Sequence, residues 1–175
     1  MKQAFLEAFR AKGKTGKNPN VGCVLVKNNL IIARARTSPG GRPHAEENLI
    51  SQLPKKELKG SSLFVTLEPC AHKGKNGISC AELISISGIK EVFISTLDPD
   101  LRTSGRGIEI LRNSKINVYP DFLVSEGNDL NKGYLTNHLQ NRPFVTIKIA
   151  MSLDGKIALK NKNSKWITNE LSRSF

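Results

Sequence analysis

The chain has 175 residues and carries 27 Lys and Arg against 15 Asp and Glu, a formal net charge of +12 at pH 7. This length fits one ordinary domain, or one domain with a piece of another, and excludes a large multidomain assembly. Residues 1–60 hold 12 of the basic groups and 4 of the acidic ones. A basic front end suits nucleic acid or a phosphorylated substrate, and equally a solvated surface, so charge alone does not identify a partner.

Neither a membrane span nor a disulfide framework is expected. No apolar run approaches the roughly 20 residues that cross a bilayer, and residues 1–14 lack the core and cleavage site of a signal peptide. Cys23, Cys70 and Cys80 are an odd number in a chain without an export signal, which argues for thiols that pack or bind metal. We therefore expect a cytoplasmic protein without a membrane partner.

The predicted elements begin with a helix, in which apolar residues from Ala4 to Phe9 recur at helical spacing. Runs rich in Val, Ile and Leu on either side of Asn28-Asn29 predict a β-hairpin. Its strands are expected at 21–27 and 30–36, further helices at 44–53, 81–87, 108–112 and 123–139, and further strands at 63–67, 91–96 and 117–119. This alternation predicts an α/β fold, a three-layer α/β/α domain with a mixed sheet.

The last segment does not fit into that domain. Residues 143–151 show a fresh strand pattern, and a turn follows at Asp154-Gly155. About 33 residues cannot bury a core of their own. We therefore expect a first domain over residues 1–141, and over 142–175 either a tail packed on it or the opening of a second domain.

Three short elements carry the chemistry: His44-Ala45-Glu46, Glu68-Pro69-Cys70, and Cys80. One imidazole and two thiolates give Zn²⁺ three protein ligands, and a fourth position left open for water is typical of a catalytic site. Glu46 is placed to take the proton of that water. The order resembles the zinc deaminase pattern H-x-E…P-C-x-x-C, in which the activated water attacks an amidine-like carbon. Cys23, inside an apolar run, is predicted to pack in the core.

The spacing of the two cysteines departs from that pattern. Nine residues separate Cys70 from Cys80 where the pattern has two, so the insertion must loop out beside the metal. His72, Lys73 and Lys75 lie in this insertion, and they would be placed to meet an anionic group of a substrate.

Together these segments resemble the bifunctional deaminase/reductases of riboflavin biosynthesis. The resemblance rests on Asn18-Pro19-Asn20-Val21-Gly22-Cys23-Val24, Pro43-His44-Ala45-Glu46, Glu68-Pro69-Cys70-Ala71-His72 and Cys80-Ala81-Glu82, and on the long cysteine spacer with its inner histidine. It implies a cytidine-deaminase-like domain over residues 1–141. Segments between 143 and 168 resemble the opening of that family's reductase domain, which has a dihydrofolate-reductase-like fold and uses NADPH. Residues 142–175 would be its truncated start, without reductase activity.

Carried over residue by residue, the resemblance implies a site. His44, Cys70 and Cys80 would be the zinc ligands and Glu46 the proton shuttle, while Asn18, His72, Lys75 and Asp98 would bind the substrate. The implied reaction is hydrolytic removal of the 2-amino group of 2,5-diamino-6-(5-phosphoribosylamino)pyrimidin-4-one, which gives the uracil and ammonia.

Two residues of the implied substrate-binding set differ from the family. Thr37 stands where the family usually has His, and Asp100 where it often has Asn. An acid at position 100 repels a phosphate unless a nearby base offsets it.

Two other functions remain open. A nucleic-acid deaminase, such as one acting on tRNA adenosine, is favoured by the net charge and the His-Ala-Glu element. The nine-residue spacer and an aromatic content of only 6% argue against it, because few side chains are available to stack on bases. The other alternative is a non-catalytic zinc-binding derivative. The oligomeric state is left open, a homo-oligomer included.

Overall fold

The computed structural model describes residues 1–73 and 77–174. It divides into two compact units, residues 1–144 and 145–175, which are described separately. Lys75, one of the expected substrate-binding residues, lies outside the described residues. Within these residues, no helix is long and apolar enough to cross a membrane.

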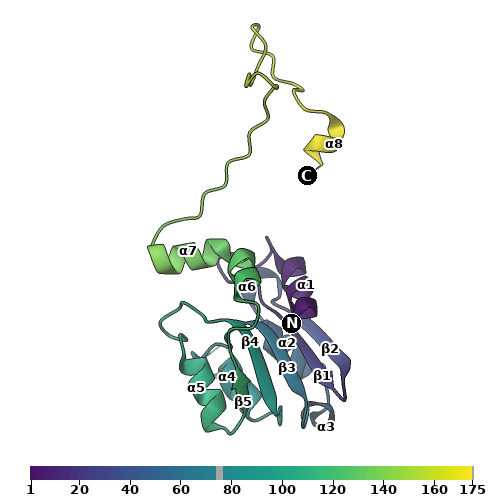
Figure 1. Cartoon of the computed structure of the whole chain (residues 1–175), viewed down its shortest axis with the longest axis vertical. Coiled ribbons are helices and arrows are strands. Elements are labelled where there is room, and N and C mark those ends of the chain that lie inside the picture. The colour runs from purple at the N-terminus through teal and green to yellow at the C-terminus, as the bar shows by residue number, and fades with distance from the viewer. Residues whose placement is uncertain (74–76, 175) are drawn as a thin grey trace. The chain divides into compact units, whose positions relative to one another are not determined.

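A five-stranded sheet forms the centre of the first unit (Figure 1). Its strands are β1 (Gly22–Lys27), β2 (Leu30–Arg36), β3 (Ser62–Leu67), β4 (Glu91–Thr96) and β5 (Asn117–Tyr119), in the order β2-β1-β3-β4-β5. β1 pairs antiparallel with β2 and β3, whereas β3, β4 and β5 run parallel. The predicted mixed sheet is therefore confirmed. Asn28 and Asn29 both have positive φ, which a tight turn between twisted strands requires.

Helices cover both faces of this sheet. α1 (Lys2–Ala11) packs on β1 and β2 next to α6 (Val124–Leu130), which also contacts β4. α2 (Ala45–Ser51), also on β1 and β2, lies against α4 (Cys80–Ser85), and α4 contacts α5 (Arg106–Asn113). Shorter elements are a 3-10 turn at Pro39–Gly41 and α3 (Lys55–Leu58). The arrangement is the expected three-layer α/β/α fold.

The core lies between the sheet and the two helix layers. Its largest buried side chains come from the central strands and the helices that face them: Leu25, Leu49, Leu63, Ile84, Ile94 and Leu111. Strands covered on both faces are apolar on both, which is why 63–65 and 92–94 have almost continuous apolar runs. Cys23 is fully buried in this core, as the sequence predicts.

The single helix expected at 123–139 is instead two helices, α6 and α7 (Lys132–Gln140). Asn131, between them, has non-helical backbone angles and a buried side chain. Its Oδ1 accepts a hydrogen bond from the Asn20 backbone N–H at 2.8 Å, and its Nδ2 donates to the Asn20 carbonyl oxygen at 3.2 Å. These bonds join the break to the loop before β1, which local periodicity does not reveal.

The strand expected at 143–151 was wrong. Residues 143–150 have no regular secondary structure, and Val145, Ile147 and Ile149 are exposed. A strand is stable only when a neighbouring strand satisfies its backbone hydrogen bonds, and no strand is found among the described residues of 145–175. This unit contains turns and one short helix, α8 (Glu170–Arg173).

Gly22 allows α1 to lie directly on β1. A Cβ at Gly22 would come within 2.1 Å of the Ala4 carbonyl oxygen and 2.4 Å of the Ala8 backbone nitrogen. We expect Gly22→Ala to lower the free energy of unfolding by about 2–3 kcal/mol, because backbone atoms cannot move aside as side-chain ends can. The control is Gly133→Ala on exposed α7. The atom nearest to an added Cβ there is 3.8 Å away, so the free energy of unfolding should not fall. Urea denaturation of both variants measures the difference, and equal stability would contradict it.

Candidate metal centre and pocket

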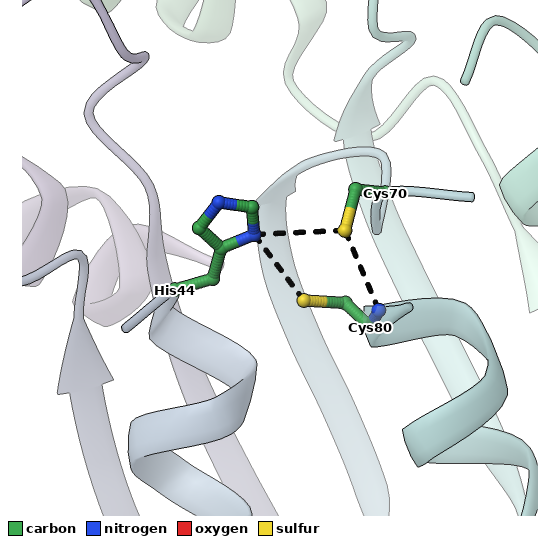
Figure 2. Close-up of side chains that lie close together, drawn as sticks. All are labelled: His44, Cys70 and Cys80. Atoms are coloured by element: carbon green, nitrogen blue, oxygen red, sulfur yellow. Dashed lines mark hydrogen bonds between the residues drawn. The ribbon is translucent and has the colours of Figure 1, made fainter. Parts of the chain in front are cut away.

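Three potential metal ligands, from separate segments of the sequence, lie close together (Figure 2). His44 is the N-cap of α2, Cys70 lies in the loop that follows β3, and Cys80 is the first residue of α4. Figure 2 shows the imidazole of His44 turned towards both sulfur atoms. The fold thus brings together the three residues that the sequence singled out.

The distances between these atoms suit a single zinc ion. His44 Nδ1 lies 3.6 Å from Cys70 Sγ and 3.3 Å from Cys80 Sγ, and all three ligand atoms lie within 4.8 Å of one another. With Zn–S near 2.3 Å and Zn–N near 2.0–2.1 Å, tetrahedral coordination separates the nitrogen from each sulfur by about 3.6 Å. The donor set and its spacing therefore fit Zn²⁺.

Hydrogen bonds favour a thiolate at Cys70. The Cys80 backbone N–H, at the start of α4, donates to Cys70 Sγ at 3.4 Å. The Cys80 thiol, together with His44, lowers the pKa of Cys70 to about 4. The hydrogen bond with Cys70, together with burial, raises the pKa of Cys80, so the Cys80 thiol keeps its proton. A divalent cation displaces such a proton, because it binds thiolates and not thiols.

Glu46, the second residue of α2, lines the same pocket as His44 and Cys70. Its side chain is almost completely buried, and Oε2 has no hydrogen-bond partner among the described residues. Burial raises the pKa of this carboxyl to about 7. A buried oxygen without a partner is costly unless another group meets it, which suits a site completed by a metal-bound water and a substrate.

The pocket has a volume of about 200 Å³ and is lined by Asn18, His72 and Asp98 as well as by His44, Glu46 and Cys70. Asn18 Nδ2 donates to the carbonyl oxygens of Thr15 and Gly40, and its Oδ1, without a hydrogen-bond partner among the described residues, is left for a ligand. Asp98 Oδ1 accepts from the Tyr134 hydroxyl at 2.8 Å. Three of the four expected substrate-binding residues therefore lie in one pocket, and the fourth, Lys75, lies outside the described residues.

Thr37 and Asp100, which differ from the usual residues of the family that the sequence resembles, also line this pocket. Thr37 is buried, and its Oγ1 accepts from the Val21 backbone N–H at 3.1 Å. Asp100 is paired with Arg102, whose Nη2 lies 2.5 Å from Asp100 Oδ2. Arg102 is therefore the nearby base that offsets the negative charge of Asp100.

Other residues of the pocket were not predicted from the sequence. Arg102, Tyr134 and His138 line it, and the rings of Tyr134 and His138 lie 4.4 Å apart. Tyr134 comes from α7, which the sequence places in a different part of the chain from the metal ligands. Only a further resemblance to the deaminase/reductases of riboflavin biosynthesis, over Leu130-Asn131-Lys132-Gly133-Tyr134, could have indicated it.

Glu68 holds the loop between β4 and α5, which carries the pocket residues Asp98, Asp100 and Arg102. Its buried carboxylate accepts backbone N–H bonds from Asp98, Gly105 and Ile108 at 3.1–3.3 Å. We expect Glu68→Gln to cost about 1–3 kcal/mol of unfolding free energy, because an amide NH₂ would replace one acceptor and face N–H donors. Thermal denaturation measures this cost. Glu109→Gln, on the surface of α5, should change stability little, and equal effects of the two substitutions would contradict this role for Glu68.

Comparisons with known proteins agree with this site. The model of the cytidine and deoxycytidylate deaminase zinc-binding region matches residues 1–96, and that of the RibD C-terminal domain matches residues 143–175. The riboflavin biosynthesis protein RibD of Aquifex aeolicus is 43% identical over 99% of this chain and 48% of its own length. The chain thus spans about half the length of the curated relatives it matches.

Solved structures show the same relationship. A diaminohydroxyphosphoribosylaminopyrimidine deaminase/5-amino-6-(5-phosphoribosylamino)uracil reductase from Thermotoga maritima superposes with a TM-score of 0.92 at 43% identity, covering 99% of this chain and 50% of that one. A tRNA:A34 deaminase superposes with a TM-score of 0.58 at 27% identity, covering 74% and 96%. The zinc-binding region, the coverage by RibD relatives and the shared fold together show that this chain belongs to the cytidine and deoxycytidylate deaminase family, within its RibD group.

Proposed function

We propose that this chain is a zinc-dependent deaminase of riboflavin biosynthesis, which hydrolytically removes the 2-amino group of 2,5-diamino-6-(5-phosphoribosylamino)pyrimidin-4-one. The observation that carries this proposal is the buried Glu46 carboxylate, without a partner for Oε2, in the same pocket as His44 and Cys70. The name of the Thermotoga maritima relative supplies the substrate.

In this proposal His44, Cys70 and Cys80 hold the ion. Zinc bound by these residues would supply an activated water and act as a Lewis acid. Glu46 Oε2 receives a proton from the water and delivers it to the leaving amine nitrogen, a task for which a carboxyl of raised pKa is suited. The amino group leaves as ammonia and the ring carbon gains an oxygen.

The remaining pocket residues orient the substrate. Asn18 presents Oδ1 for an N–H of the pyrimidine, because its own amide hydrogens are already bonded to backbone carbonyls. His72, held at 3.3 Å from Thr103 Oγ1, faces the same space. For Asp98, one oxygen binds Tyr134, so its contact with substrate is expected through the other.

An ammonia-release assay tests the proposal. The zinc-loaded chain should deaminate the phosphorylated diaminopyrimidine and leave cytidine unchanged. An adenosine-bearing tRNA stem-loop is included because of the likeness to a tRNA:A34 deaminase. Release from the stem-loop alone would favour the nucleic-acid alternative, and no release from any of the three would favour a non-catalytic zinc protein.

A further inference from the structure

A paired Asp100 and Arg102 lie at the edge of the pocket, and the proposed mechanism does not use them. The pair is held by several bonds: Arg102 Nε lies 3.0 and 3.1 Å from the two Asp100 oxygens, and Nη2 lies 2.5 Å from Oδ2. The Asp100 side chain is 10% exposed, whereas that of Arg102 is 67% exposed. The carboxylate is therefore inside, and the guanidinium lies over it on the solvent side.

The backbone fixes this pair relative to the metal site. Asp98 Oδ1 accepts from the Asp100 N–H at 3.0 Å, and Asp100 Oδ1 accepts from the Arg102 N–H at 2.9 Å. Thr103, the next residue, has its Oγ1 3.4 Å from the Ala71 backbone nitrogen and 3.3 Å from His72 Nδ1. The turn that carries Arg102 is thus bonded to the segment directly after the ligand Cys70.

Arg102 retains donors for a ligand. Its bonds to Asp100 use Nε and one N–H of Nη2, so the N–H groups of Nη1 have no partner among the residues that the structure describes. The ion pair lowers the pKa of Asp100 to about 2, so the carboxylate stays charged and keeps the guanidinium in place at neutral pH. A guanidinium fixed in this way is suited to a phosphate monoester, which accepts two parallel N–H bonds.

We propose that Arg102, positioned by Asp100, binds the phosphate group of the substrate at the mouth of the pocket. The inference rests on the proposed function, because it concerns the far end of that substrate. Lys17 and Arg42 also line the pocket. However, Arg42 Nη1 makes only one ion pair, at 3.5 Å from Glu47 Oε2. The Lys17 ammonium has no hydrogen bond or ion pair among the described residues. Arg102, with several bonds to Asp100, is therefore the cation with the best-defined position in the pocket.

Kinetics with two substrates tests this role. For Arg102→Ala, KM for the phosphorylated diaminopyrimidine should rise about ten- to a hundredfold with kcat changed less than about threefold, the usual effect of losing a hydrogen bond to a charged group. KM for the same compound without its phosphate should not change. Arg102→Lys should recover only part of the loss, and Arg106→Ala, a nearby exposed arginine outside the pocket, should show none.

The double variant Asp100→Asn/Arg102→Ala separates binding from charge compensation. If Arg102 only neutralises Asp100, the double variant regains the parental KM, and that result overturns the proposal. If Arg102 contacts the phosphate, KM stays raised. Calorimetric titration with ribose 5-phosphate provides a readout without turnover: binding by the parent and its loss in Arg102→Ala supports the inference even if deamination fails, whereas equal binding by both overturns it.

Discussion

Glu46→Gln should abolish deamination while zinc remains bound. The amide has nearly the shape of the carboxylate, but it cannot accept the proton of the attacking water or pass it to the leaving amine. General acid–base catalysis contributes typically about 10²–10⁴-fold, so we expect kcat to fall by at least about 10²-fold. The zinc content should match that of the parent, because the three ligand atoms come from His44, Cys70 and Cys80. Ammonia release and metal analysis on the same preparation measure both quantities.

The stability of this variant provides a second readout. Glu46 is buried, Oε2 has no partner among the described residues, and its pKa is raised to about 7 by burial. Removing a buried carboxylate therefore removes a desolvation cost, and Glu46→Gln should be at least as resistant to denaturation as the parent. Glu47→Gln, in the same turn of α2 but bonded to the His44 backbone N–H, should lose stability and keep most of its activity. Full activity in Glu46→Gln would overturn the catalytic role of this residue.

Much of the fold follows from local patterns. The hairpin, the parallel strands and the helix that follows His44 were predicted within a few residues, because each has a strong apolar period and a turn or cap at its end. The break at Asn131 was missed, because it depends on hydrogen bonds to Asn20, more than a hundred residues away. The strand expected at 143–151 failed for a related reason: a strand pattern does not form a strand without a neighbour.

The residues of the site likewise include some that the sequence indicates and some that it does not. His44, Glu46, Cys70 and Cys80 were singled out because their types and order resemble the zinc deaminase pattern, and the structure brings the three potential ligands, His44, Cys70 and Cys80, within 4.8 Å of one another. Arg102 was not found, since an exposed arginine in a loop has no distinguishing local pattern. Its place in the pocket depends on Asp100, which by itself suggested only repulsion towards a phosphate.

Replacing each of the three cysteines in turn should show which of them bind zinc. Cys70→Ser and Cys80→Ser should each reduce zinc from about one ion per chain to a small fraction, because a hydroxyl does not ionise and cannot replace a thiolate. Cys23→Ala should keep its zinc, because Cys23 is buried in the apolar core and is not part of the metal cluster. Zinc per chain after dialysis, measured by atomic absorption, tests all three variants.

In the absence of metal, Cys23→Ala should lose more unfolding free energy than Cys80→Ser, although it is the variant that keeps its zinc. In metal-free protein Cys23→Ala should leave a small cavity in the apolar core, at a cost of about 1 kcal/mol of unfolding free energy. Metal-free Cys80→Ser should differ less from the metal-free parent, because the thiol it replaces is a neutral, hydrogen-bonded group. Added zinc should then raise the melting temperature of the parent and of Cys23→Ala, since an ion that binds only the folded state stabilises it, and should have little effect on Cys70→Ser and Cys80→Ser. A zinc-dependent rise in either serine variant would mean that the ion is held elsewhere, and the assignment of His44, Cys70 and Cys80 as ligands would fail with it.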